Sequence, residues 1–469
     1  ARARELGLEQ RAARLLQEQE SQVGQFSEFL DKLSRSDRLY MQLLNQVGTK
    51  DSEVLEDDHG HGLIADLNFF ETITAIFKST VGPAVLYIPN GFLQSGFAFA
   101  IPMMCLSYVM IAWSSSNLLS ASRKYKMGFS GLMGKAFGST GERVIEVVII
   151  FQQCGICLTY FIFVAHNLYE ILASMGYDVS LQALCIWQLF LYIPLTFIRN
   201  LQTFACTNLI ANALILFSLA VLLKFAFATI EESVLKEQLI MFNENSFYRF
   251  VGTSVFLFEG IMALCVPLQE AVREDLKDSF PTIFVVTLGI IVFSYMLFGA
   301  LNYSAYGDDT DMVLTANLPE GNWRSLVQLA YASSVVFSFP LQLFPAVGIF
   351  TGFFKRAKLN LQQKGYDAID GETEDLENTA TKSPKNLWKG NLGRSALVIL
   401  LCFISVMNVD KLDKMVSLLG ALFGVPLALI IPSSIHLKVC TDSPHWVKQV
   451  NLIIISLGIF FATSCSMIV

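Results

Sequence analysis

The sequence has few charged residues for its length: 16% of its 469 residues are Asp, Glu, Lys or Arg, against roughly 25% in soluble domains. This shortage excludes an ordinary soluble domain. The net charge of −7 and the lack of a basic tract exclude the surface that nucleic-acid binding requires. The sequence also lacks a cluster of metal-ligand residues, an activated nucleophile and a phosphate-binding loop. We therefore expect no enzyme, no cofactor and no metal site.

Apolar residues take the place of the missing charge, since 53% of the chain is hydrophobic. Many apolar runs reach the 18 or so residues that cross a bilayer as a helix. They predict an all-α integral membrane protein embedded in lipid. We expect eleven spans, at about Leu67–Asn90, Gly96–Ser120, Glu142–Ile171, Leu181–Ile198, Thr207–Ile230, Phe247–Glu270, Phe280–Ala305, Trp323–Phe354, Ala396–Asn408, Met415–Lys438 and Val447–Ile468.

Residues 67–469 form the membrane domain, and two polar regions flank or interrupt it. Residues 1–66 form a tail in which apolar residues recur at helical spacing, which predicts one or two amphipathic helices. The tail is interpreted either as a solvated segment or as a docking element for a cytosolic protein or a plug over the transport path. Residues 356–392 form a loop with an acidic, polar centre, which predicts disorder.

Lys and Arg are distributed unevenly between the loops on the two sides. Because cytosolic loops are enriched in these residues, the asymmetry places the N-terminus in the cytosol and the C-terminus on the lumenal side. The richer side carries Arg123, Lys124, Lys126, Lys135, Arg199, Arg273, Lys277, Lys355, Arg356, Lys358, Lys438 and Lys448.

Two spans are interrupted near mid-membrane by glycine or proline. The first carries Gly82-Pro83, and the sixth carries Glu259-Gly260 and then Pro267. Interrupted helices at corresponding positions of two halves indicate the midplane site of a transporter. We therefore expect spans one to five and six to ten to form two inverted repeats, with discontinuous helices one and six and an added eleventh span.

A helix break can bind a ligand that carries both charges. Freed N–H groups at the start of a half-helix attract an anion, and freed carbonyl groups attract a cation. At the first break Pro83 has no N–H to give, so the candidate donors are those of Gly82, Ala84, Val85 and Leu86. An α-amino acid has a carboxylate and an ammonium group and would fit.

Glu259 is the leading candidate for proton coupling, because a carboxylate at bilayer depth is costly and its pKa responds to burial and neighbouring charge. A structural role in the broken helix is the alternative. Lys78, one turn before the first break, could face Glu259 or extend to the cytosolic interface. Polar residues of spans three and eight could add a further wall to the site or join helices by hydrogen bonds; the candidates include Tyr160, Ser333 and Ser334.

Several ordered motifs resemble the amino acid/auxin permease family of the amino acid–polyamine–organocation superfamily. The resemblance covers about residues 68–469. The sequences of the sixth and eighth spans are most similar to the vacuolar and lysosomal branch of the family. The motifs are KSTVGPAVLYIPNGFLQSG at Lys78–Gly96, QCGICLTYFIFVAHNL at Gln153–Leu168, FEGIMALCVPLQEAVRE at Phe258–Glu274, FPLQLFPA at Phe339–Ala346 and SLLGALFGVPLALIIPSSIH at Ser417–His436.

The resemblance implies a LeuT-like fold of inverted five-helix repeats and proton-linked or facilitated movement of neutral amino acids. Two departures concern the site: the chain reads Gly-Pro-Ala where the family usually has Gly-Thr-Gly, and Ala75 stands where the animal proton-coupled branch carries His. The second departure favours Glu259 as the proton site. Carried over by position, the family's substrate site falls on Val81, Gly82, Pro83, Ala84 and Val85 and on Phe258, Glu259 and Gly260.

The sequence thus favours a secondary active transporter of amino acids, proton-coupled, in a vacuolar or lysosomal membrane. Two alternatives remain open. The protein could be an amino-acid sensor that signals through its cytosolic tail, or a carrier of another small organic acid such as auxin.

Overall fold

The computed structural model describes residues 28, 31–39, 41, 67–198, 205–232, 239–366 and 384–468. Side chains of residues 205–206, 232, 259–261, 263–264, 354–366, 384–390 and 465–468 lie outside this description. Within the described part the regular elements are helices, joined by one isolated β-bridge between Leu67 and Val272. This confirms the predicted all-α class.

Seven helical stretches in the described part are long and apolar enough to cross a membrane alone. They include α4 (Phe97–Tyr125), α5 (Phe129–Ser174), α8 (Ala205–Glu232), α12 (Phe280–Tyr306), α13 (Asn322–Tyr366) and α17 (His445–Ile468). The seventh combines α15 (Leu412–Leu419), two π-helical turns (Gly420–Gly424 and Pro426–Ile430) and α16 (Ile431–Val439).

The other predicted spans are short or divided. The first consists of α2 (Phe69–Thr80), a 3₁₀ turn η1 (Pro83–Tyr87) and α3 (Ile88–Ser95). The fourth is α6 (Leu181–Trp187) with α7 (Leu189–Phe197), the sixth α9 (Phe247–Phe256) with α10 (Glu259–Ala271), and the ninth α14 (Pro384–Met407). The eleven-span count and the inverted repeat therefore stay predictions.

Local sequence explains two boundaries that position the bundle. Asn68 caps α2: its side chain accepts from the Glu71 N–H at 3.0 Å, and the Glu71 carboxylate accepts from the Asn68 N–H at 3.0 Å. In α5, Gly138 has φ of 70°, a left-handed conformation that glycine adopts readily. The kink separates the stretch ending at Phe137 from the long span.

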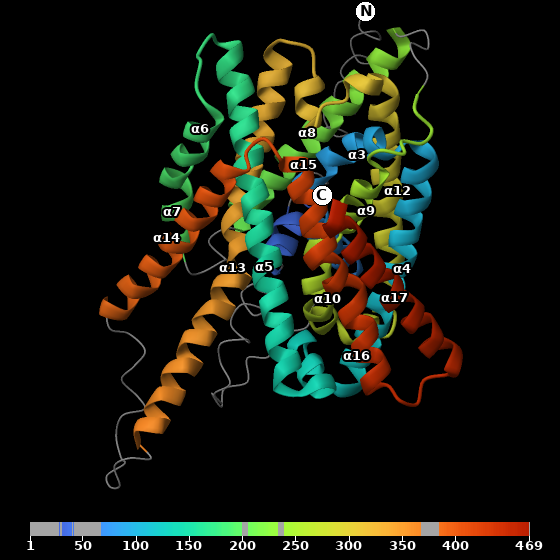
Figure 1. Cartoon of the computed structure of the whole chain (residues 1–469), viewed down its shortest axis with the longest axis vertical. Coiled ribbons are helices and arrows are strands. Elements are labelled where there is room, and N and C mark those ends of the chain that lie inside the picture. Colours follow the sequence, from blue (N-terminus) through green and yellow to red (C-terminus); the bar gives the residue numbers. More distant parts are fainter. Residues whose placement is uncertain are drawn as a thin grey trace, which may run out of the picture.

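Helix α13 packs along both α5 and α8, and α9 packs on α15 (Figure 1). Figure 1 shows α3 and α15 in the upper half of the bundle and α10 and α16 in the lower half. We call the lower side, where α2 begins and α10 ends, the tail side, because the described tail residue Arg35 contacts Glu71 there. The opposite side, where α3 ends and α9 begins, is the far side.

The two polar regions are described only in part. Helix α13 continues to Tyr366 and α14 begins at Pro384, so helices extend into both ends of the loop predicted to be disordered. Residues 367–383, its centre, lie outside the described residues. Of the tail, residues 28, 31–39 and 41 are described and are helical.

Candidate substrate cavity between the two helix breaks

The first span is interrupted at Val81 and Gly82. Helix α2 ends with the Val81 N–H donating to the Phe77 carbonyl at 2.8 Å, and Gly82 has an extended conformation. The chain then enters η1 at Pro83, whose fixed φ and missing N–H suit the first position of a helical turn. The break predicted from Gly82-Pro83 is therefore confirmed.

Two buried tyrosines hold the carbonyl groups that this break releases. The Tyr295 hydroxyl of α12 donates to the Thr80 carbonyl at 3.0 Å, and the Tyr331 hydroxyl of α13 donates to the Gly82 carbonyl at 3.3 Å. A carbonyl oxygen has two lone pairs, so each can accept a second donor. The break is anchored to α12 and α13 and retains acceptor capacity.

The sixth span is divided between α9 and α10. Helix α9 ends at Phe256, a turn covers Leu257 and Phe258, and α10 starts at Glu259. The predicted discontinuity is present and lies directly before Glu259. The Glu259 side chain, proposed for proton coupling, and the surroundings of Gly260 lie outside the described residues.

The two breaks border one cavity with a volume of about 120 Å³. By this measure roughly 10–15 Å³ admits one water molecule, so the cavity holds several. Its described lining comes from both breaks and from α5, α8 and α13: Lys78, Ser79, Thr80, Val81, Gly82, Pro83, Ala84, Tyr87, Gln153, Thr159, Tyr160, Asn208, Asn212, Ile215, Phe256, Leu257, Ser334, Val335, Ser338, Leu341, Gln342 and Pro345.

Of the site residues expected from sequence, six line this cavity: Val81, Gly82, Pro83, Ala84, Tyr160 and Ser334. Three described ones do not. Val85 and Phe258 are each 1% exposed and pack in the core, and Ser333, the neighbour of Ser334, is half-buried outside the lining. The sixth-span break reaches the cavity through Phe256 and Leu257 instead.

The sequence reasoning missed two amides of α8. Asn208 and Asn212 are four residues apart, on one face of a helix, and both line the cavity. Buried polar residues at this spacing in an apolar span are a signal that could have found them. On the opposite wall the Gln342 amide of α13 donates to the Gln153 side chain of α5.

Lys78, in the last turn of α2, pairs with a tail residue that the sequence did not indicate. Its Nζ lies 2.5 Å from Oδ1 of Asp37 in the tail, and the side chain is only 6% exposed, so it does not extend to the interface. Asn208 donates to the same Asp37 oxygen at 3.0 Å. Near the start of α2, Nε of Arg35 lies 3.1 Å from the buried Glu71 carboxylate.

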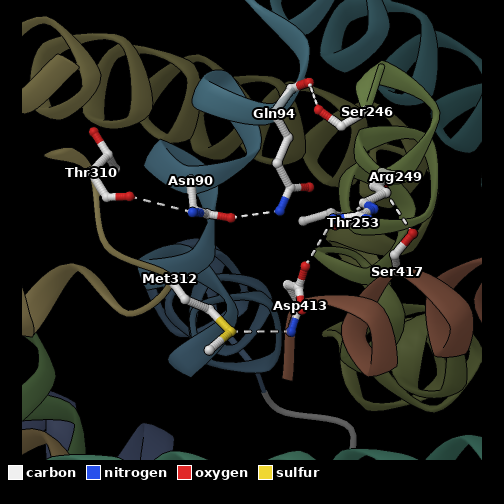
Figure 2. Close-up of polar contacts among 9 residues, drawn as sticks. All are labelled: Asn90, Gln94, Ser246, Arg249, Thr253, Thr310, Met312, Asp413 and Ser417. Carbon is white, nitrogen blue, oxygen red and sulfur yellow. Dashed lines mark hydrogen bonds and ion pairs between the residues drawn. The ribbon is translucent and has the colours of Figure 1, made fainter. Parts of the chain in front are cut away.

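The far side is closed by polar contacts between α3, α9 and α15 (Figure 2). Arg249 of α9 pairs with Asp413 of α15 at 3.2 Å, and the Ser417 hydroxyl donates to the Arg249 carbonyl at 2.8 Å. The Ser246 hydroxyl donates to the Gln94 carbonyl at 2.7 Å. The cavity left among these helices is about 10 Å³, enough for one water molecule at most.

Backbone contact tightens this closure. A Cβ atom on Gly252 would lie 2.0 Å from the Ser417 carbonyl oxygen, and one on Gly420 would lie 2.1 Å from the Gly252 carbonyl oxygen. Since real Cβ atoms do not approach so closely, glycine is required where α9 meets the tenth span. The central cavity is therefore sealed from the far side by an ion pair and a direct backbone contact.

Comparison with known proteins agrees with this architecture. The chain is 30% identical to vacuolar amino acid transporter 4 of Saccharomyces cerevisiae, over 77% of this chain and 52% of that protein. It is 28% identical to vacuolar amino acid transporter 3 of the same yeast, over 88% of this chain and 57% of that protein. It thus spans about half the length of these two relatives. Amino acid transporter AVT3B of Arabidopsis thaliana is 26% identical, over 84% of this chain and 91% of that protein.

Among solved structures, a nucleobase-cation-symport-1 family transporter in a closed conformation aligns with a TM-score of 0.49 and 13% identity, over 80% of each chain. That likeness is too weak to carry an argument. The family comparison is decisive, because residues 66–469 match the family described as transmembrane amino acid transporter protein. The chain therefore belongs to this family of transporters, the amino acid/auxin permeases, and is not an enzyme.

Proposed function

We propose that the protein is a secondary active transporter that moves neutral amino acids by alternating access. The observation that carries the proposal is the polar cavity bordered by both helix breaks and sealed on the far side. The first N–H groups of η1 suit a carboxylate, and the Thr80 and Gly82 carbonyls suit an ammonium group. The cavity thus offers both charges of an amino acid a partner.

The membrane and the orientation follow from separate arguments. The relatives named vacuolar amino acid transporters support a vacuolar or related endomembrane. The Lys and Arg asymmetry of the loops supports a cytosolic tail side and a lumenal far side. The described conformation then corresponds to a carrier closed toward the lumen.

We further propose that transport is coupled to protons through Glu259. The support is the position of this carboxylate in the sixth span, at the first residue of α10, next to the break that borders the cavity. A carboxylate in a membrane span is costly in its charged form and is typical of proton pathways in transporters. A different coupling cation is the alternative outcome of the experiment below.

Reconstitution tests the proposal. Purified protein in proteoliposomes is offered each amino acid, with and without an inward pH gradient, and auxin serves as the competing substrate. We expect saturable uptake of one or more neutral amino acids that an imposed pH gradient increases. Absence of flux for every amino acid under both conditions would contradict the carrier function.

The docked tail segment gives one specific reason to consider a sensor as the second function. Deletion of residues 1–60 separates the two. A carrier without its tail continues to move amino acids in vesicles. A sensor moves none with or without its tail, and loses recruitment of its cytosolic partner when the tail is removed.

A further inference from the structure

A segment of the tail lies against the central cavity, although it is distant in sequence from every residue that it meets. Residues 31–39 are helical, and Figure 1 draws this segment in dark blue near the middle of the bundle. Asp37 is 41 residues from Lys78 and 171 residues from Asn208. Both partners line the cavity. The tail therefore places a carboxylate at the wall of the proposed substrate path.

The described part of the tail contacts the bundle through several residues of this helix. Ser36, Asp37 and Met41 are buried, whereas Lys32 and Arg35 keep about half of their side chains exposed. Arg35 adds an ion pair with Glu71 of α2. The described segment therefore meets the bundle through buried residues as well as through charged ones.

Asp37 is also imperfectly satisfied where it lies. Its Oδ1 atom accepts from both Lys78 and Asn208, but its buried Oδ2 atom has no hydrogen-bond partner. Burial raises the pKa of the Asp37 carboxyl even with the Lys78 ammonium beside it. A buried ion pair costs desolvation energy that its attraction only partly returns. The buried pair is therefore a weak source of stability for the docked segment.

The cavity wall has donor capacity that Asp37 does not use. The amide nitrogen of Asn212, one turn beyond Asn208, is buried without a hydrogen-bond partner. An ammonium group such as that of Lys78 has three N–H donors. A small free carboxylate can reorient to use such donors, which a carboxylate fixed on a helix cannot do. Lys78 and the two α8 amides together have the chemistry of an anion site.

We propose that Lys78 and Asn208 form an entry subsite for a carboxylate at the tail-side end of the cavity, which the α-carboxylate of the substrate occupies before it reaches the N–H groups of η1, and that Asp37 occupies this entry subsite as an internal competitor. This inference rests on the amino acid transport proposed above. An amino acid that approaches from the tail side must displace Asp37, and an undocked tail leaves the subsite free. The tail thus lowers the apparent affinity on one side of the membrane.

The competition predicts a specific kinetic pattern. When only part of the population is competent to bind, the apparent dissociation constant rises by the inverse of that fraction. Removal of the competitor should therefore lower KM for uptake from the tail side and leave kcat nearly unchanged. Uptake from the far side, where Asp37 does not lie in front of the substrate, should keep its KM.

The test uses full-length protein in proteoliposomes sorted by whether an N-terminal epitope is accessible from outside. Asp37→Asn should lower the tail-side KM by about fivefold or more, the usual scale of coupling between two ligands. Glu28→Gln is the matched control, since it removes one negative charge from an exposed position of the same segment. Lys78→Gln should raise the tail-side KM, and Asp37→Asn should add little in that background.

A second measurement keeps Asp37 in place and reports docking directly. In the double variant R35C/E71C a thiol-reactive cross-linker joins the segment to α2, because these side chains are in contact. The amino acid that the flux screen accepts best should lower the cross-link yield several-fold. Its amide, which lacks the carboxylate, should not. The single variant R35C controls for the native cysteines.

The outcomes separate this inference from the function on which it rests. If the unmodified protein moves no amino acid, the proposed function fails and this inference fails with it. If the unmodified protein transports but Asp37→Asn matches Glu28→Gln, only the competition is wrong. Equal loss of cross-link with the amino acid and its amide would overturn the carboxylate subsite and leave simple occlusion by the tail.

Discussion

The guanidinium of Arg249 and the carboxylate of Asp413 form an ion pair 3.2 Å long between α9 and α15, and it closes the side of the protein opposite the tail (Figure 2). About three quarters of each side chain is buried, so water screens the pair less than it screens an exposed one. Opening toward the far side must break it. Several consequences of this geometry can be measured.

Loss of the ion pair should shift the population toward the far-side-open state. We expect Asp413→Asn to increase far-side opening about fivefold, since such a pair contributes about 1 kcal/mol. A cysteine at Thr253, which lines the small far-side cavity, reports opening through its labelling rate with an impermeant thiol reagent. The charge swap R249D/D413R should restore slow labelling. Fast labelling in the swapped variant would show that the pair does not hold the gate.

The glycine contact between α9 and the tenth span should tolerate no side chain. Gly252→Ala places a methyl group into the Ser417 carbonyl, and overpacking of this kind costs about 1–3 kcal/mol. We expect a lower thermal midpoint in detergent and fast labelling of the Thr253 cysteine. Gly424→Ala is the matched control, because its added Cβ would meet Val255 at an ordinary 3.7 Å. Equal stability of the two variants would contradict the close contact.

The Tyr295 hydroxyl should stabilise the first break. Tyr295→Phe removes the donor to the Thr80 carbonyl, and a buried acceptor left without its donor costs about 1–3 kcal/mol. Tyr192→Phe is the control: this buried hydroxyl has no hydrogen-bond partner, so its removal should change stability little. Thermal unfolding of both variants decides the point. A Tyr192 variant as unstable as the Tyr295 variant would refute the assignment.

The proton-coupling role of Glu259 makes a kinetic prediction. Glu259→Gln keeps the size of the side chain but cannot ionise, so uptake driven by a pH gradient should fall about tenfold or more, the scale of a lost proton-transfer group. Exchange of labelled for unlabelled amino acid, which needs no net proton movement, should fall much less. Equal loss of both activities would indicate a binding or structural role for this carboxylate.

The two helix breaks could be predicted from the sequence because their cause is local. Pro83 cannot donate to the helix that precedes it, and the structure interrupts the first span at Val81 and Gly82. The kink at Gly138 also has a local cause, the backbone conformation of a single glycine. Backbone preference at one residue is enough to place such features, so they need no knowledge of the neighbouring helices.

The contacts of Lys78 could not be predicted in this way. Its partner Asp37 comes from a polar segment whose sequence indicates amphipathic helix but gives no docking position. Phe258 illustrates the same limit: its family position implied a binding role, while packing turns the side chain into the core and leaves Leu257 at the cavity. Which side of a helix faces a cavity depends on the helices around it, and these are set by the whole fold.

The Gly252–Gly420 contact also bears on how quickly the far side can open and close. Two backbone surfaces that meet without side chains have no rotamers to order on closing and no interlocked groups to disengage on opening. Resistance to opening therefore comes mainly from the Arg249–Asp413 pair and the hydroxyl contacts beside it. Because the charges of this pair attract one another and a glycine contact carries no charge, we expect the pair rather than the glycines to decide how readily this side opens.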